Sequence, residues 1–223
     1  MNIDEQKRRL LAQLRRDISD QRVLEAMESV PREDFVPESS RHLAYEDSAL
    51  SIGEGQSISQ PLIVAMMVAS LGLKLSDKVL EVGTGSGYQA AILSLLVREV
   101  ITTERLSSLA GGAQARLVQM GYSNVTVLPA GDTLGCQAEA SFDAIIVAAG
   151  APRLPRVLLA QLAEGGRLSI PVGSRREQDL LVVEKTQDGY SVKSLGPCRF
   201  VPLVGPGAWE GDSEDHYYEP EFV

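Results

Sequence analysis

The chain has 223 residues, 44% of them hydrophobic, which is enough for one sizeable globular domain with an appendage and excludes a largely disordered protein. Its formal net charge of −9 argues against a general nucleic-acid binder, because phosphate neutralisation needs clustered lysine and arginine. Its two cysteines, Cys136 and Cys198, are far apart and lack metal-ligand spacing, which argues against a disulfide framework or a metal site.

Residues 1–50 are predicted to form a helical and irregular cover on the core. Apolar residues at helical spacing indicate helix over residues 5–30, interrupted at Asp20, a good N-cap residue. Basic and acidic residues interleave there, which favours a solvated helix face over a nucleic-acid site. After Pro31 the chain is rich in turn-forming residues, and His42 is interpreted as a satisfied or exposed histidine without a catalytic role. The opening stretch lacks a signal-peptide core and no apolar run approaches membrane length, so we expect a cytoplasmic protein with no membrane partner.

The next segment, SIGEGQSISQP (51–61), alternates small and polar residues with two isoleucines. Pro61 suits the first turn of a helix that extends to Gly72. The side chain of Ser57, Ser59 or Gln60 is expected to cap that helix. The free amides at its N-terminus would favour a nearby carboxylate, although a cap with no further role explains the segment equally well.

The stretch VLEVGTGSGYQAAILSLLVREVITTE (79–104) is predicted to fold as a strand, a tight turn, a buried helix and a second strand. Glycines at 83 and 85 permit a sharp turn and close approach of a ligand, and Gly87 is expected to let the helix start pack near the strand. Glu104 ends the second strand, where an acid in a nucleoside-binding fold meets the ribose hydroxyls. The alternative is that the glycines only build a turn.

Downstream, strands and helices continue to alternate. Helices are expected at 106–120 and 155–162, with Gly165-Gly166 ending the second, and strands at 125–128, 142–148 and 167–172. Residues 180–184 and 190–195 read as an antiparallel pair. The pattern predicts an α/β, Rossmann-like fold in which a mostly parallel sheet carries helices on both faces and an antiparallel C-terminal hairpin. The acidic tail 206–223 is expected to be flexible, with His216 at the surface.

The pattern E-x-G-x-G-x-G at 81–87 is typical of class I S-adenosylmethionine-dependent methyltransferases. Over Arg22 to Gly205 the chain resembles the protein-L-isoaspartate (D-aspartate) O-methyltransferase family. Six segments in the right order carry this resemblance: VPREDFVP (30–37), SIGEGQSISQP (51–61), VLEVGTGSGYQAA (79–91), FDAIIV (142–147), GGRLSIPVG (165–173) and RFVPLVG (199–205). Residues 51–205 would then form the methyltransferase core.

The resemblance implies methyl transfer from S-adenosyl-L-methionine to the free carboxylate of L-isoaspartyl residues in damaged proteins and peptides, which starts repair through a succinimide. The product would be S-adenosyl-L-homocysteine, and the enzyme would act as a monomer. Ser59 would be the catalytic residue, and the substrate would lie against Ile58, Ser59, Val201, Pro202 and Leu203. The cofactor would contact Gln56, Glu81, Gly83, Thr84, Gly85, Glu104, Arg105 and Asp132. No general base is required, because a carboxylate with a pKa of about 4 is already ionised near neutral pH.

Two departures from the family pattern leave alternatives open. The loop Gly131-Asp132-Thr133 is one glycine short, and Glu54 places a negative charge where the family has His or Tyr. That charge either disfavours an anionic substrate or faces solvent. The rival functions are a related carboxyl methyltransferase with one dedicated peptide substrate and a cofactor-binding homologue with little turnover.

Overall fold

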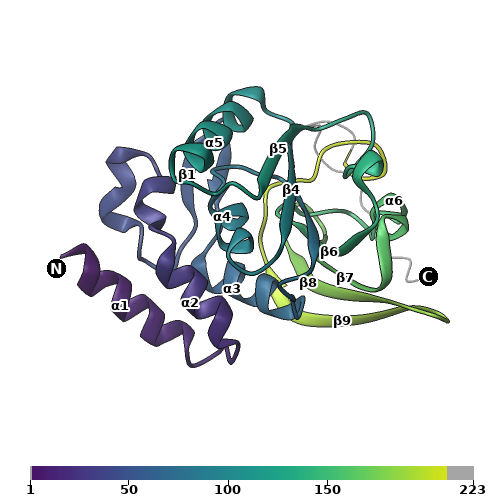
Figure 1. Ribbon diagram of the computed structural model, residues 1–223, viewed down its shortest axis with the longest axis horizontal. Helices are drawn as coiled ribbons and strands as arrows, with labels where there is room; N and C mark the ends of the chain where they lie inside the picture. The colour runs from purple at the N-terminus through teal and green to yellow at the C-terminus, as the bar shows by residue number, and fades with distance from the viewer. Residues whose placement is uncertain (1, 210–223) are drawn as a thin grey trace.

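The computed structural model describes residues 2–209 and shows a seven-stranded sheet with helices on both faces (Figure 1). The strand order is β5-β4-β3-β6-β7-β8-β9. Strands β5 to β7 of this order are parallel, whereas β8 and β9 are antiparallel. The strands are β3 Lys78–Val82, β4 Glu99–Glu104, β5 Val125–Pro129, β6 Phe142–Val147, β7 Leu162–Gly173, β8 Gln178–Thr186 and β9 Gly189–Cys198. The predicted Rossmann-like fold with an antiparallel C-terminal hairpin is confirmed.

Successive residues of the parallel strands point to opposite faces and build two separate cores. In β3, Val79 packs with the N-terminal helices while Leu80 packs with the α6 side, and both are fully buried. Burial on both faces explains the near-continuous apolar runs in the sequence. The helices are α1 Ile3–Leu14, α2 Gln21–Ser29, α3 Pro61–Ser70, α4 Tyr88–Ser94, α5 Ser107–Gln119 and α6 Arg156–Ala160.

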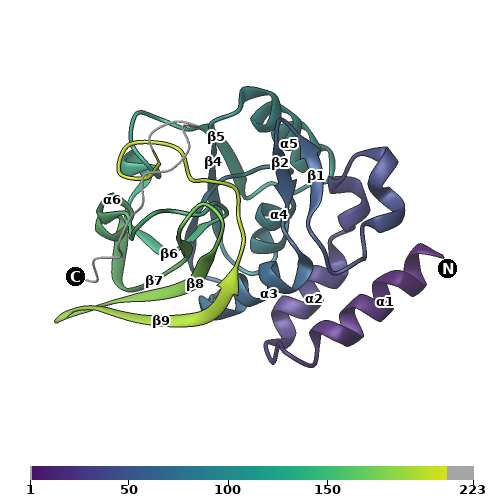
Figure 2. The same ribbon diagram turned by 180° about the vertical axis from the view of Figure 1, so that it is seen from behind.

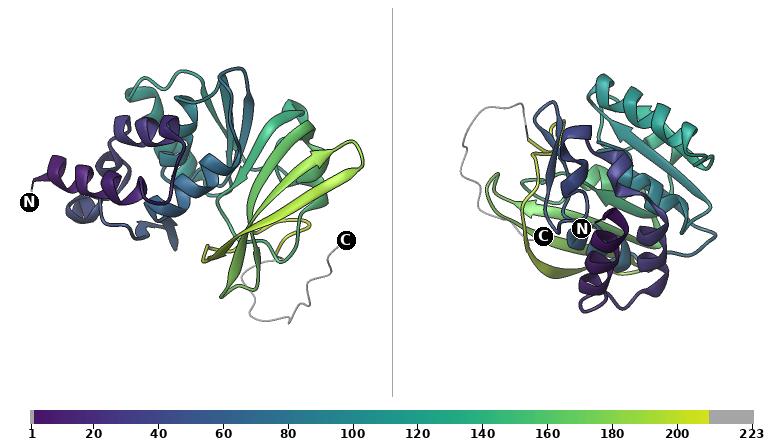
Figure 3. Two further views of the ribbon diagram at one scale, coloured as in Figure 1. Left: turned by 90° about the horizontal axis from the view of Figure 1, so that it is seen from below. Right: turned by 90° about the vertical axis from the view of Figure 1, so that its left-hand side faces the viewer.

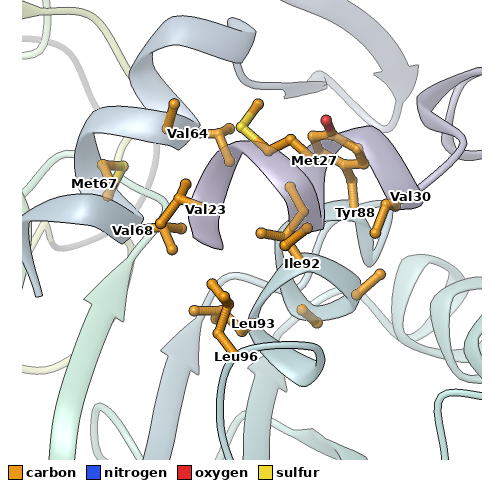
Figure 4. Packing of buried hydrophobic residues seen from close by; sticks show 14 of the residues in the cluster. Val23, Met27, Val30, Val64, Met67, Val68, Tyr88, Ile92, Leu93 and Leu96 are labelled. Carbon is orange, nitrogen blue, oxygen red and sulfur yellow. The ribbon is translucent and has the colours of Figure 1, made fainter. Parts of the chain in front are cut away.

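The larger of the two cores lies where α2, α3 and α4 converge. Figure 4 shows Met27 of α2, Val64 of α3 and Ile92 of α4 turned toward one another. The expected N-cap is confirmed, since the Asp20 carboxylate accepts hydrogen bonds from the amides of Arg22 and Val23. The irregular segment that follows contains two short 3₁₀ helices, η1 Arg32–Phe35 and η2 Glu38–Leu43. The N-terminal helices lie at one end of the molecule, far from the C-terminal hairpin (Figure 3).

The segment at 51–60 forms a hairpin that the sequence pattern does not reveal. Strands β1 Leu50–Gly53 and β2 Gln56–Ile58 pair antiparallel beside the helices (Figure 2). The expectation that Ser57, Ser59 or Gln60 caps α3 is wrong. Asp47 takes that place: one of its carboxylate oxygens accepts from the Leu62 amide at 2.9 Å and the other from the Gln60 side chain at 2.9 Å.

Glycines explain two further differences from the expected elements. Helix α6 is shorter than predicted, and Gly165-Gly166 lies inside β7 instead of ending the helix. A Cβ on Gly166 would lie 3.1 Å from the Asp143 carbonyl, so the close approach of β7 to β6 requires glycine there. Gly87 adopts φ +87°, and a Cβ on it would lie 3.3 Å from Leu117 of α5. It therefore permits packing of two helices instead of a helix on a strand.

None of the helices in residues 2–209 has the length and apolar surface that a bilayer crossing needs. Most of the predicted flexible tail, residues 210–223 with His216, lies outside the described residues. The division at residue 50 between cover and core stays a prediction.

Candidate active site

A pocket lies at the carboxyl ends of the parallel strands, where the strand order reverses between β3 and β6. In open α/β sheets this reversal is the usual place for a ligand. The turn after β3, the end of β4, the loop after β6 and the C-terminal segment 201–206 contribute to its walls. We call it the inner pocket.

The turn after β3 is held by hydrogen bonds to β4. Gly83 has φ +97°, and its amide donates to the Thr103 carbonyl at 2.9 Å. The amides of Gly85 and Leu106 donate to the two carboxylate oxygens of Glu104, at 2.9 and 3.0 Å. A carboxylate offers about four acceptor positions, so the Glu104 side chain can still accept two hydroxyl groups from a ligand. This geometry fits the role predicted for Glu104.

Glu81 is the second acid of the inner pocket and is 0% exposed. Its carboxylate accepts from the Gln89 amide at 3.1 Å and from the Thr102 hydroxyl at 2.5 Å, and Thr102 also hydrogen-bonds Thr84 at 2.7 Å. Burial raises the pKa of Glu81 to about 8, with a smaller contribution in the same direction from Glu104. A bound cationic group would favour the ionised form of this carboxyl.

A second hollow, the outer cavity, adjoins the inner pocket and shares several residues with it. The residues common to both walls are Ser57, Ser59, Ala148, Val201 and Pro202. The half-buried Ser59 therefore stands at the junction, with the inner pocket on one side and the outer cavity on the other. A group transferred between ligands in the two hollows would pass beside it.

The C-terminal segment is fixed next to the end of β6. The amide of Gly150 donates to the Val201 carbonyl at 2.8 Å, and the amide of Leu203 donates to the Gly150 carbonyl at 2.8 Å. The Trp209 indole also donates to the Gly150 carbonyl, at 3.0 Å. Main-chain hydrogen bonds thus bring this segment to Ser59 from more than a hundred residues away in sequence.

The structure brings together nearly all of the predicted site residues. The inner pocket is lined by every predicted substrate and cofactor residue except Asp132: Gln56, Ile58, Ser59, Glu81, Gly83, Thr84, Gly85, Glu104, Arg105, Val201, Pro202 and Leu203. Asp132 is exposed, and its neighbours Gly131 and Thr133 form the wall at that point.

Glu54 lies outside both hollows. It is exposed at the tip of the β1–β2 hairpin, with φ +53°, and its carboxylate accepts a hydrogen bond from Ser108 at 3.1 Å. Of the two possibilities left open for this charge, the structure thus agrees with the one in which it faces away from the substrate.

Sequence reasoning missed three residues of the site. Gln89 and Thr102 bind the Glu81 carboxylate, and the buried guanidinium of Arg32 donates to the Ser59 carbonyl at 2.8 Å. The sequence could have indicated the role of Gln89, because a polar side chain in the first turn of a buried helix needs a buried hydrogen-bond partner. Nothing in the sequence indicated the roles of Thr102 and Arg32, since their partners Glu81 and Ser59 lie 21 and 27 residues away in sequence.

Comparisons with known proteins agree on one family. The family model for protein-L-isoaspartate(D-aspartate) O-methyltransferase matches residues 5–207. Protein-L-isoaspartate O-methyltransferase 1 of Syntrophobacter fumaroxidans is 52% identical over 196 residues, which cover 88% of this chain and 92% of the relative. The Pelotomaculum thermopropionicum enzyme is 49% identical over 211 residues, covering 94% and 92%.

A solved structure extends the similarity to three dimensions. A protein-L-isoaspartate O-methyltransferase from Plasmodium falciparum, in complex with S-adenosyl-L-homocysteine, matches with a TM-score of 0.75 and 27% sequence identity. The match covers 86% of this chain and 95% of that chain.

Proposed function

The chain belongs to the protein-L-isoaspartate (D-aspartate) O-methyltransferase family, and we propose that it methylates the free carboxylate of L-isoaspartyl residues in damaged proteins and peptides. The methyl donor is S-adenosyl-L-methionine, which leaves as S-adenosyl-L-homocysteine. The observation that carries the proposal is the position of Ser59 between an inner pocket suited to a nucleoside cofactor and an outer cavity open to a peptide.

The chemistry of the inner pocket supports cofactor binding there. The glycine turn leaves room for close approach, Glu104 offers acceptor positions to ribose hydroxyls, and Glu81 places an acid near the amino-acid end. We assign Gln56, Gly83, Thr84, Gly85 and Arg105 to the same role because they line the pocket. We also propose Asp132 as a cofactor residue, although its neighbours Gly131 and Thr133 line the inner pocket and Asp132 itself does not.

The reaction requires no general base from the protein. When bound, the cofactor supplies an activated methyl group on a sulfonium, and the substrate carboxylate is already ionised near neutral pH. Ser59 is proposed to hydrogen-bond that carboxylate and hold its oxygen toward the inner pocket. Ile58, Val201, Pro202 and Leu203 are proposed to position the peptide backbone while excluding water. Such orientation lowers barriers by up to about 7–11 kcal/mol in ideal intramolecular cases.

Repair follows from the product. The carbonyl carbon of the methyl ester is more electrophilic than that of the carboxylate, and its methoxy group can leave. The neighbouring backbone amide nitrogen attacks this carbonyl and closes a succinimide, and the methoxy group departs as methanol with the proton from that nitrogen. Water then opens the ring, and some of the product is normal aspartate. Repeated cycles of methylation and ring opening would convert most of the isoaspartate.

We also propose the finer properties expected from the sequence. The enzyme would act as a monomer in the cytoplasm, would not bind nucleic acid, and would consist of the cover 1–50, the core 51–205 and the acidic tail 206–223. These proposals rest on the charge of −9, the composition and the family resemblance.

The direct test is transfer of labelled methyl from S-adenosyl-L-methionine to two synthetic peptides that differ only in isoaspartate or aspartate at one position. Transfer to the isoaspartyl peptide alone is expected. Cofactor binding without transfer to either peptide would contradict the proposal and favour a dedicated substrate or a homologue with little turnover. Binding of S-adenosyl-L-homocysteine is therefore measured on the same preparation.

A further inference from the structure

The buried cation Arg32 has no role in the proposed reaction so far, although its segment carries part of the family resemblance. It is 0% exposed, yet no carboxylate in residues 2–209 forms an ion pair with it. Burying a charge without an ionic partner is costly, so the guanidinium must be stabilised by dipoles or by a ligand. Its surroundings show which groups do this.

The Arg32 guanidinium donates to main-chain carbonyls from two segments. Nε donates to Ala44 at 2.9 Å, and Nη2 donates to Ser59 at 2.8 Å and more weakly to Ser48 at 3.4 Å. The planar fork therefore ties the loop before β1 to the residue at the junction of the two hollows. A lysine has no such fork and could not hold both carbonyls in the same geometry.

The same guanidinium also packs on the aromatic ring of Tyr88, a residue of the inner pocket. Its central carbon lies 4.8 Å from the ring centroid of Tyr88, which lines the pocket. Nη1 is buried without a hydrogen-bond partner. Desolvation by burial lowers the pKa of Arg32, and Tyr88 and Asp47 oppose that effect. An arginine guanidinium is effectively always protonated in proteins, so we treat Arg32 as a cation.

We propose that Arg32 is a positioning residue with two effects: it fixes the main chain of Ser59, and its charge makes the junction selective for an ionised carboxylate over a neutral isostere. This inference rests on the proposed function. Bond lengths limit the distance from Nη2 to the Ser59 hydroxyl to under about 9 Å. At an effective dielectric constant of about 20, a unit charge at roughly 10 Å changes anion affinity by about tenfold.

The test compares peptide binding with turnover. An isoaspartyl peptide and its isoasparaginyl analogue, in which the carboxylate is an amide of the same shape, are titrated into the protein saturated with S-adenosyl-L-homocysteine. We expect the affinity ratio of acid to amide to fall about tenfold in Arg32→Met. Because binding requires no turnover, this result is independent of whether the wild-type protein methylates the peptide in the labelled-methyl assay.

Arg32→Lys separates the two effects and covers the case in which Arg32→Met does not fold. It keeps the charge and loses the fork, so kcat should fall at least tenfold while the acid-to-amide ratio and the affinity for S-adenosyl-L-homocysteine stay within about twofold of wild type. If S-adenosyl-L-homocysteine binding weakens in proportion to kcat, Arg32 has a general structural role and the proposal is wrong. An unchanged kcat would also overturn it.

Arg22→Met is the matched control. Arg22 likewise donates to two main-chain carbonyls, Leu73 at 2.8 Å and Leu96 at 3.0 Å, but these residues precede the amino ends of β3 and β4, whereas the site lies at the carboxyl ends. Its loss should lower the unfolding temperature and leave both the affinity ratio and kcat unchanged. If Arg22→Met shifts the ratio as much as Arg32→Met, charge at the junction is not the cause.

Discussion

The inner pocket and the outer cavity meet at Ser59 but differ in charge. Two acids, Glu81 and Glu104, lie in the inner pocket, and the exposed Arg105 is the basic residue of its lining. The outer cavity has Arg175 and Arg199 in its described lining and no acidic side chain. The described lining of the outer cavity thus carries two arginines, although the whole chain has a net charge of −9.

This difference suits the two ligands of the proposed reaction. A sulfonium and an ammonium group would be stabilised beside buried acids, whereas a substrate carboxylate would be stabilised by arginines. The two hollows also differ in construction. The C-terminal segment that returns from the far end of the chain contributes to both hollows, but the inner pocket also has the turn after β3, which is held by hydrogen bonds to the next strand.

The largest expected effect concerns the pH dependence of stability, through Glu81. Its pKa is raised from 4.5 to about 8, so between these values the folded protein keeps a proton that the unfolded chain has lost. The stabilisation is fully present below about pH 4.5 and is lost as the pH rises toward 8. The free energy of unfolding should therefore decrease by up to about 1.4 kcal/mol per pH unit in this window, on the order of 5 kcal/mol in total.

Denaturant unfolding of wild type and Glu81→Gln at several pH values measures this effect. The glutamine variant should lose most of the slope between pH 5 and 8, because its amide does not titrate. Glu54→Gln is the control, since Glu54 is exposed and lies outside both hollows. Equal slopes in Glu81→Gln and wild type would show that other groups cause the pH dependence.

The second largest expected effect concerns cofactor affinity and involves only the inner pocket. Glu104→Gln removes the charge that binds the amides of Gly85 and Leu106 and that is proposed to accept ribose hydroxyls. Hydrogen bonds to charged groups contribute about 1.5–3 kcal/mol each, so affinity for S-adenosyl-L-homocysteine should fall by about 100-fold in calorimetric titration. Glu99→Gln, at the other end of β4, should bind normally. Unchanged affinity in Glu104→Gln would remove this residue from the cofactor site.

The same contrast explains what the sequence could predict. The strand, glycine turn, helix and Glu104 occupy one uninterrupted stretch, 79–104, whose spacing predicts one wall of the inner pocket. The parallel sheet was likewise predictable from apolar runs at regular intervals. Even there, the contact of Gly87 with Leu117 depends on how two helices pack, which spacing does not determine.

The outer cavity and the junction at Ser59 were harder to predict, because the contacts there join residues that are far apart in sequence. Arg32 binds the Ser59 carbonyl, and Asp47 replaces the expected cap of α3. The hairpin β1–β2 was hidden, since its strands are short and the turn between them runs through Gly53, Glu54 and Gly55, all with positive φ. Only the family resemblance predicted a substrate-binding role for Ser59 and Val201; the residue pattern predicted Ser59 as a helix cap, which is wrong.

The third effect concerns the junction between the two hollows. Ser59→Ala removes one hydroxyl that is proposed to hydrogen-bond the substrate carboxylate, a contact of about 1.5–3 kcal/mol when one partner is charged. We expect kcat/KM for an isoaspartyl peptide to fall about 10- to 100-fold, with the affinity for S-adenosyl-L-homocysteine nearly unchanged. Ser57→Ala is the neighbouring control and should have a smaller effect. An equal loss of turnover and cofactor affinity would place Ser59 outside the substrate site.

The smallest expected effect concerns the arginines of the outer cavity and the charge of the residues that flank isoaspartate in the peptide. Arg199 is exposed in the outer cavity, two residues before Val201, which lines both hollows. Along an extended chain this separation is about 7 Å, so an acidic side chain close to the isoaspartate in a bound peptide can approach the guanidinium. Exposed ion pairs contribute about 0.2–1 kcal/mol, which corresponds to a preference of up to about fivefold.

Isoaspartyl peptides with glutamate or lysine at flanking positions provide the measurement. The wild-type enzyme should show a higher kcat/KM for the glutamate peptides at low ionic strength, and the preference should shrink as salt screens the charges. Arg199→Gln should reduce it further. Arg98 pairs with Glu99 at the amino end of β4, away from both hollows, so Arg98→Gln should leave the preference unchanged. If wild type prefers lysine peptides, or if Arg199→Gln has no effect, the arginines of the outer cavity do not select the peptide, and the difference in charge would serve only the two reacting groups.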